Sequence, residues 1–144
     1  MSQSHAETPL RHGIAPYRAA PEEPYMSPDQ EAHFRAILLA WRRELMEEVD
    51  RTVDHMKLDS VHCPDPNDRA SQESDMELEL RTRERERRLL SKIDKALRVL
   101  DDHAYGYCTE CGAEIGIGRL EARPTADLCI SCKTRQEAKE HLSG

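Results

Sequence analysis

The stretch CPDPNDRA, residues 63–70, interrupts the longest helix-forming part of the sequence. Between Asp29 and Tyr105 there is no glycine, and the only prolines are Pro64 and Pro66. Each proline removes a backbone donor and disfavours helical geometry in the residue before it, so the chain must bend at this point. The sequence therefore predicts two long helices joined by one tight, polar turn.

The first helix is expected to begin directly after Ser27. Ser27 is a typical N-cap, Pro28 suits the first helical position, and Gln30 can complete a capping box. Apolar residues then recur at steps of three and four, which places them on one face of the helix. These residues are Phe34, Leu38, Trp41, Leu45, Val49, Val53 and Met56.

Past the break, Asp68 is expected to cap the second helix. Its apolar positions are Met76, Leu80, Leu89, Ile93, Leu97 and Leu100. Two helices of similar length joined by a tight turn fold back on one another, so each can cover the apolar stripe of the other. The predicted fold is mainly α, with a long antiparallel coiled-coil hairpin over residues 27–102.

The middle of the second helix has no apolar side chain between Leu80 and Leu89, where the sequence reads RTRERERR. Such a run is either a solvated helix face or a basic surface that contacts a partner. If Met56 lies opposite Met76, antiparallel pairing sets residues 45–49 across from this run. The hairpin is then expected to be weakest here, because local stability follows buried apolar contacts.

Four cysteines near the C-terminal end form two CxxC pairs, Cys108 with Cys111 and Cys129 with Cys132, separated by 17 residues. This spacing is typical of a tetrahedral zinc site with four thiolate ligands. Four thiolates fill the coordination shell, so the zinc is expected to be structural and the protein is not expected to be an enzyme. Two disulfides are the alternative, but nothing in the sequence indicates secretion, and cytosolic thiols stay reduced.

Composition and charge limit the remaining possibilities. The chain has 144 residues, of which 34% are charged, and a net charge of −7. It has neither an apolar segment at the start nor a run long enough to span a membrane, which favours a soluble, cytoplasmic protein with no membrane partner. A negative net charge opposes direct binding to DNA, which needs clustered Lys and Arg.

Three regions follow from these patterns: a proline-rich segment over 1–26 that is mostly disordered or draped on the rest, the hairpin over 27–102, and a zinc module with a C-terminal helix over 103–144. A hairpin that covers its own stripe predicts a monomer. A coiled-coil scaffold or adaptor without transcriptional activity would instead dimerise. The aspartates at 64–70 fit ordinary turn chemistry, or they serve an arm that delivers acidic groups to a narrow site.

From about Tyr25 to its end the sequence resembles the bacterial DksA transcription factors. The resemblance is most specific in PDPNDRASQE, in RERERRLLSKI and in YGYCTECGAEIGIGRLEARPTADLCISCKT. It implies that a zinc-bearing domain holds a coiled-coil hairpin that enters the secondary channel of RNA polymerase. It also implies that the acidic tip, here Asp65, Asp68 and Ala70, acts near the catalytic magnesium of the polymerase.

The same resemblance implies that the alarmone ppGpp is a co-effector. In that family ppGpp binds between the factor and the polymerase rim, promoter open complexes at ribosomal RNA genes are destabilised, and amino-acid biosynthesis promoters are favoured. The matching ppGpp residues here are Leu89, Lys92, Arg123 and Lys133, and Arg85 matches a residue that contacts the rim. The sequence departs from the family pattern at Gly118, where a basic residue is expected, and in having a fifth cysteine, Cys63, at the tip.

Overall fold

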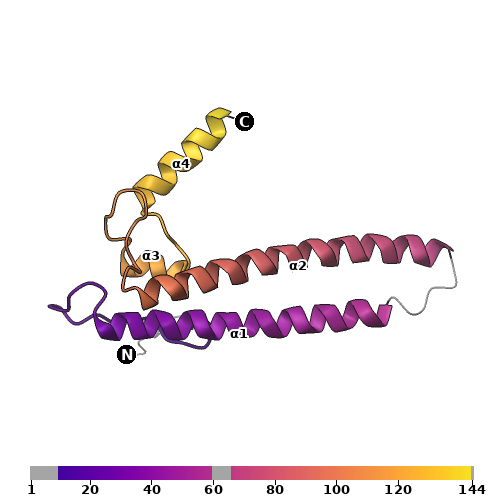
Figure 1. Cartoon of the computed structure of the whole chain (residues 1–144), viewed down its shortest axis with the longest axis horizontal. Helices are drawn as coiled ribbons and strands as arrows, with labels where there is room; N and C mark the ends of the chain where they lie inside the picture. Colours follow the sequence, from indigo (N-terminus) through magenta and orange to yellow (C-terminus); the bar gives the residue numbers. More distant parts are fainter. Residues whose placement is uncertain (1–9, 60–65, 144) are drawn as a thin grey trace, which may run out of the picture. The chain divides into compact units, whose positions relative to one another are not determined.

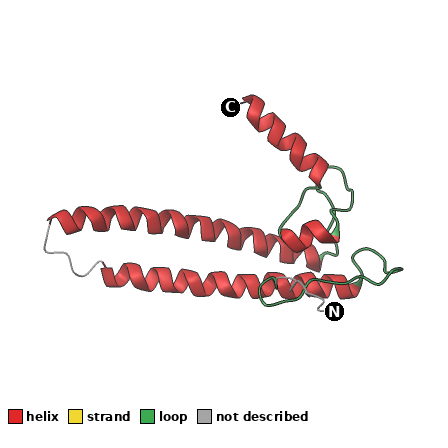
Figure 2. Ribbon diagram, turned by 180° about the vertical axis from the view of Figure 1, so that it is seen from behind, coloured by secondary structure: helices red, strands yellow, loops and turns green. Residues whose placement is uncertain are grey.

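The computed structural model describes residues 10–59 and 66–143, which form four helices (Figure 1). Helix α1 spans Pro28–Asp59, α2 Pro66–Asp101, α3 Ile117–Ala122 and α4 Ile130–Ser143. Within these residues the chain is helix and loop (Figure 2), and extended pairing is limited to isolated bridges such as Tyr107 with Glu114. None of the described helices is long and apolar enough to cross a membrane. Cys63, Pro64 and Asp65 lie outside the described residues.

The start of α1 confirms the predicted helix boundary. The helix begins at Pro28, and the backbone N–H of Gln30 donates to Ser27 Oγ at 3.3 Å. The Gln30 side chain does not close a standard capping box, because its Oε1 accepts from the N–H of Met26 at 2.7 Å, one residue before the cap. Both Ser27 and Gln30 are buried, so two polar groups at this helix start are satisfied away from water.

The start of α2 corrects the prediction for Asp68. The helix begins at Pro66, so Asp68 lies inside the first turn and is not the N-cap. Pro66 occupies the first helical position, where its missing N–H costs no intrahelical hydrogen bond. A carboxylate in the first turn still interacts favourably with the helix dipole.

The chain divides into two compact units, which are Trp41–Asp94 and the remainder, Met1–Ala40 with Lys95–Gly144. In the unit Trp41–Asp94, α1 and α2 run antiparallel (Figure 1). Arg42 Nε donates to Asp94 Oδ1 at 2.8 Å, and His55 Nδ1 lies 2.9 Å from Glu79 Oε1. These pairs shift the register by about three residues from the one that sets Met56 opposite Met76.

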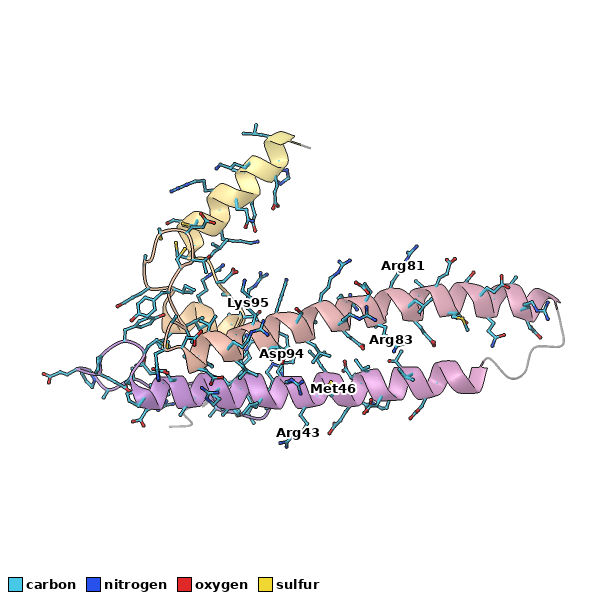
Figure 3. The ribbon with its side chains drawn as sticks, in the orientation of Figure 1. Arg43, Met46, Arg81, Arg83, Asp94 and Lys95 are labelled. Atoms are coloured by element: carbon cyan, nitrogen blue, oxygen red, sulfur yellow. The ribbon has the colours of Figure 1, made fainter. Side chains whose placement is uncertain are left out.

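Part of the face of α2 toward α1 is polar in this unit, from Glu79 to Glu86. Glu86 is buried at 6% exposure, and Arg83 is half-buried on the side of α2 that faces α1 (Figure 3). Leu80 is 49% exposed, which contradicts its predicted place on the apolar stripe. The reason is helical spacing, because Glu79, Arg83 and Glu86 already occupy the contact positions at steps of four and three.

The other unit holds most of the buried apolar residues. Phe34 and Leu100 are fully buried, and the Phe34 ring packs on Tyr105 with centroids 5.5 Å apart. In the zinc module, Ile115 and Leu120 are buried, whereas Ile117 and Leu128 are half-buried. Tyr105 in this core lies three residues before Cys108, the first of the four clustered cysteines.

Candidate metal centre and arm tip

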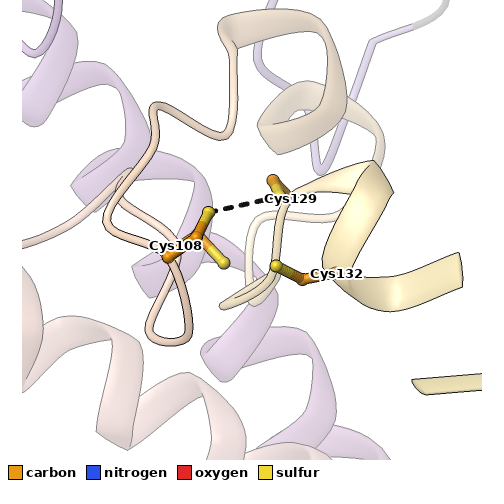
Figure 4. A group of neighbouring side chains, drawn as sticks. Cys108, Cys129 and Cys132 are labelled. Carbon is orange, nitrogen blue, oxygen red and sulfur yellow. Dashed lines mark hydrogen bonds between the residues drawn. The ribbon is translucent and has the colours of Figure 1, made fainter. Parts of the chain in front are cut away.

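The four cysteines converge as the spacing predicts. Their sulfurs all lie within 4.8 Å of one another, and the Sγ atoms of Cys111 and Cys129 are 3.7 Å apart. Figure 4 shows the side chains of Cys108, Cys129 and Cys132 directed toward one point. Cys108 and Cys132 are buried, whereas Cys111 is exposed, so one edge of the cluster meets water.

This arrangement fits a tetrahedral zinc ion. Zinc–sulfur bonds of about 2.3 Å place tetrahedral sulfurs about 3.8 Å apart, close to the separation of Cys111 and Cys129. A four-thiolate shell leaves no ligand position for water or substrate. The cluster therefore supports a structural zinc, which would hold the two CxxC segments together and contribute to folding of the module.

The electrostatics of the cluster also favour a cation. A hydrogen bond from the backbone of Cys129 is the main cause that lowers the pKa of Cys108, to about 6. Hydrogen bonding with the neighbouring sulfurs, first that of Cys129, raises the pKa of Cys132. Adjacent sulfurs resist joint ionisation, so a divalent cation is the natural compensation for four thiolates in contact.

Local hydrogen bonds position both CxxC segments. The N–H of Gly112 donates to the Cys108 carbonyl at 2.9 Å, and the left-handed φ of Gly112, 77°, allows this turn. The N–H of Thr109 donates to the Asp127 carbonyl at 2.9 Å, which joins the first cysteine pair to the segment before the second. Arg119 Nε on α3 donates to the Leu128 carbonyl at 3.0 Å. Sequence patterns did not predict α3.

The segment over residues 10–26 belongs to the same unit and contacts the rest of it through specific polar groups. The backbone N–H of Tyr17 donates to Glu121 Oε1 at 2.8 Å, and His33 Nε2 lies 2.6 Å from the same oxygen. Glu23 accepts from the hydroxyls of Ser27 and Tyr17, and these two hydrogen bonds lower the pKa of the Glu23 carboxyl. Glu23 thereby links this segment to the cap of α1.

The predicted tip residues are only partly described. Asp65 lies outside the described residues, while Asp68 and Ala70 are exposed in the first two turns of α2. Both described residues are accessible to a partner.

The residues matched to ppGpp binding fall in both units. On α2, Leu89 is half-buried and Lys92 is exposed, in the same unit as the exposed Arg85. In the other unit, Arg123 is exposed at the end of α3 and Lys133 is half-buried on α4.

Comparison with known proteins gives two family matches that together cover most of the chain. Residues 30–100 match the N-terminal domain of the DnaK suppressor protein DksA, and residues 103–138 match the prokaryotic dksA/traR C4-type zinc finger. The second match contains all four clustered cysteines.

Individual relatives agree with these matches. The sequence is 58% identical over 128 residues to the RNA polymerase-binding transcription factor DksA of Escherichia coli K12, covering 89% of this chain and 85% of that protein. It is 54% identical over 128 residues to the protein of the same name from Haemophilus influenzae, covering 89% of this chain and 88% of that one. The solved structure of transcription factor DksA2 from Pseudomonas aeruginosa aligns with a TM-score of 0.78 and 41% identity, over 81% of this chain and 90% of that one.

Proposed function

The chain belongs to the DksA family, and we propose that it binds RNA polymerase and regulates transcription initiation as a non-enzymatic factor in the bacterial cytoplasm. The observation that carries this proposal is the 58% identity to an RNA polymerase-binding transcription factor over 89% of the chain. The paired helices α1 and α2, here called the arm, and the four-cysteine cluster supply the two parts that such a factor requires.

In this proposal the arm enters the secondary channel of the polymerase, and its acidic tip acts near the catalytic magnesium. Asp65, Asp68 and Ala70 are the tip residues. Support comes from the exposure of Asp68 and Ala70 at the start of α2. A carboxylate that reaches a metal-containing site acts through charge, so its effect on the polymerase should depend on ionisation more than on shape.

We further propose that ppGpp is the co-effector and binds where the factor meets the polymerase rim. Lys92, Arg123 and Lys133 would contact its phosphates, and Leu89 would pack beside them. Cationic side chains suit this ligand because charge-assisted hydrogen bonds to phosphate are among the strongest available. Among the described residues, none of these three cations forms an ion pair, and neither does Arg85, the proposed rim contact.

Substitution of the tip tests the proposal directly. Asp68→Asn keeps the side-chain shape and removes its charge, so binding to polymerase should persist while the shortening of open-complex lifetime on a ribosomal RNA promoter is lost. The measurement pairs a binding assay with promoter-complex decay, with and without ppGpp. Asp75→Asn, an exposed aspartate further along α2, is the matched control and should behave as wild type.

Two results would contradict this assignment. Loss of binding in step with loss of effect would make the tip an affinity anchor, with no separate action on the active site. A wild-type protein that binds no polymerase and sediments as a dimer would favour the scaffold alternative.

A further inference from the structure

The loop that carries the first cysteine pair is held closed by a residue from outside the zinc-finger segment. This loop, residues 106–116, is here called the knuckle loop. The Tyr25 hydroxyl donates to the Gly106 carbonyl at 2.7 Å and accepts from the Gly116 N–H at 3.0 Å. One side chain therefore bridges the two ends of the loop that contains Cys108 and Cys111.

Two further observations show that this contact is closely fitted. The Tyr25 ring packs edge-on against Tyr107, with centroids 5.6 Å apart and planes at 84°. A Cβ added to Gly106 would lie 3.0 Å from the Tyr25 hydroxyl oxygen and 3.0 Å from Met26 Cγ. Contacts at this distance are tight, so Tyr25 and Met26 would have to shift by a few tenths of an ångström, and the φ of 93° at Gly106 also favours glycine.

The chemistry of the hydroxyl suits a bridge between a carbonyl and an amide. A neutral phenol can donate one hydrogen bond and accept another, whereas a phenolate can only accept. A tyrosine hydroxyl is already protonated at neutral pH, and burial is the main cause that raises the pKa of Tyr25 further. The Gly106 carbonyl also accepts from the Ile115 N–H at 2.8 Å, so the neck of the loop is joined twice.

We infer that Tyr25 is a positioning residue for the metal site, which holds the knuckle loop in the geometry that presents Cys108 and Cys111 to zinc. Metal sites commonly depend on groups beyond the ligands that fix ligand orientation, and loss of such a group typically weakens metal binding 10- to 100-fold. Tyr25 contacts the loop backbone at both ends and neither sulfur directly, so an effect of about tenfold is expected.

The experiment uses the zinc-loaded full chain and follows zinc transfer to excess colorimetric chelator. Tyr25→Phe keeps the ring and removes both hydrogen bonds, so the rate of zinc release should rise about tenfold. Tyr17→Phe is the matched control, because the Tyr17 hydroxyl bonds to Glu23 and not to the knuckle loop. Equal rates for wild type and Tyr25→Phe, or equal acceleration in both variants, would overturn the inference.

Two more measurements separate positioning from general destabilisation. In the cobalt-substituted proteins, the visible ligand-field absorption should change in Tyr25→Phe and match wild type in Tyr17→Phe. In the zinc-loaded wild type, the Gly116 amide should be protected from hydrogen exchange because it donates to Tyr25. Rapid exchange of that amide, or an unchanged cobalt spectrum in Tyr25→Phe, would overturn the inference even if a variant folds poorly.

Discussion

Gly106 and Gly118 in the zinc-finger region differ in whether their surroundings require a glycine. Gly106 has a φ of 93° and faces Tyr25 and Met26. A side chain at this position would therefore strain the backbone and crowd the side chains of these two residues. Gly118 lies in α3 with an ordinary φ, and nothing lies within 4 Å of a Cβ added to it. The first glycine is required by its surroundings, whereas the second weakens the short helix that contains it.

Alanine substitution at these two positions should therefore have opposite effects. Gly118→Ala should raise the free energy of unfolding by about 0.5–1 kcal/mol, because glycine is a poor helix former. Gly106→Ala should lower it by about 1–3 kcal/mol through the strained backbone. Denaturant unfolding of the zinc-loaded proteins measures both changes, and a shift of the same sign in the two variants would contradict this reading of the loop.

At the scale of elements, the contact between α1 and α2 in the unit Trp41–Asp94 is unusual for a coiled coil. Positions that normally hold leucine or isoleucine are occupied on α2 by Glu79, Arg83 and Glu86. Glu86 is 6% exposed, and its Oε2 has no hydrogen-bond partner among the described residues. A buried polar atom without a partner costs stability.

Replacing this carboxylate by an apolar side chain should stabilise the arm. Glu86→Leu is expected to raise the free energy of unfolding by about 1–3 kcal/mol, since it removes an unsatisfied buried group and adds a packing contact. Arg87→Leu is the control at an exposed neighbour and should change stability by less than about 0.5 kcal/mol. A destabilised Glu86→Leu variant would show that the carboxylate has a stabilising partner.

The polar contact between α1 and α2 predicts that the stability against local opening varies along the arm. Amides of residues 45–50 and 81–88 should exchange hydrogen faster than those of 36–41 and 90–97 in the free protein, because fewer apolar contacts hold them. We expect the exchange to slow when polymerase binds and its acidic groups pair with residues 81–88. Hydrogen exchange followed by mass spectrometry resolves these segments, and uniform protection along the free arm would rule out a weak middle.

At the scale of the whole molecule, the stability of the zinc module should depend on zinc more than the stability of the unit Trp41–Asp94. The buried apolar residues of the module are few, with Ile115 and Leu120 as its buried aliphatic side chains among the described residues. Metal binding must therefore supply much of its folding free energy. The unit Trp41–Asp94 contains none of the clustered cysteines.

Removal of one ligand tests this division. Cys108→Ser and Cys132→Ser should each lose one equivalent of zinc, measured by metal analysis, and exchange protection should fall over 105–132. The amides of residues 45–55 and 70–90 should keep their wild-type exchange. Cys63→Ser, a cysteine outside the metal spacing, is the control and should retain zinc. Full zinc content in either ligand variant would exclude a four-thiolate site.

The sequence by itself determined the features that depend on neighbouring residues. Ser27 and Pro28 indicate the start of α1 because capping acts within one turn, and two CxxC pairs indicate zinc because each pair brings its own two sulfurs together. The break near Pro64 and Pro66 also depends on neighbouring residues, because each proline disfavours helical geometry in the residue before it. The family resemblance added the proposed roles of the tip and ppGpp residues, which stay predictions.

Only the tertiary structure decided which side chains meet across the chain. It buried Glu86 and exposed Leu80, because the face that α2 turns toward α1 depends on the contacts along both helices together and not on the apolar pattern of one helix. It also placed the Tyr25 hydroxyl between Gly106 and Gly116, which lie 81 and 91 residues away in sequence. No local pattern encodes such a bridge, since it exists only when folding brings the two segments within hydrogen-bond distance.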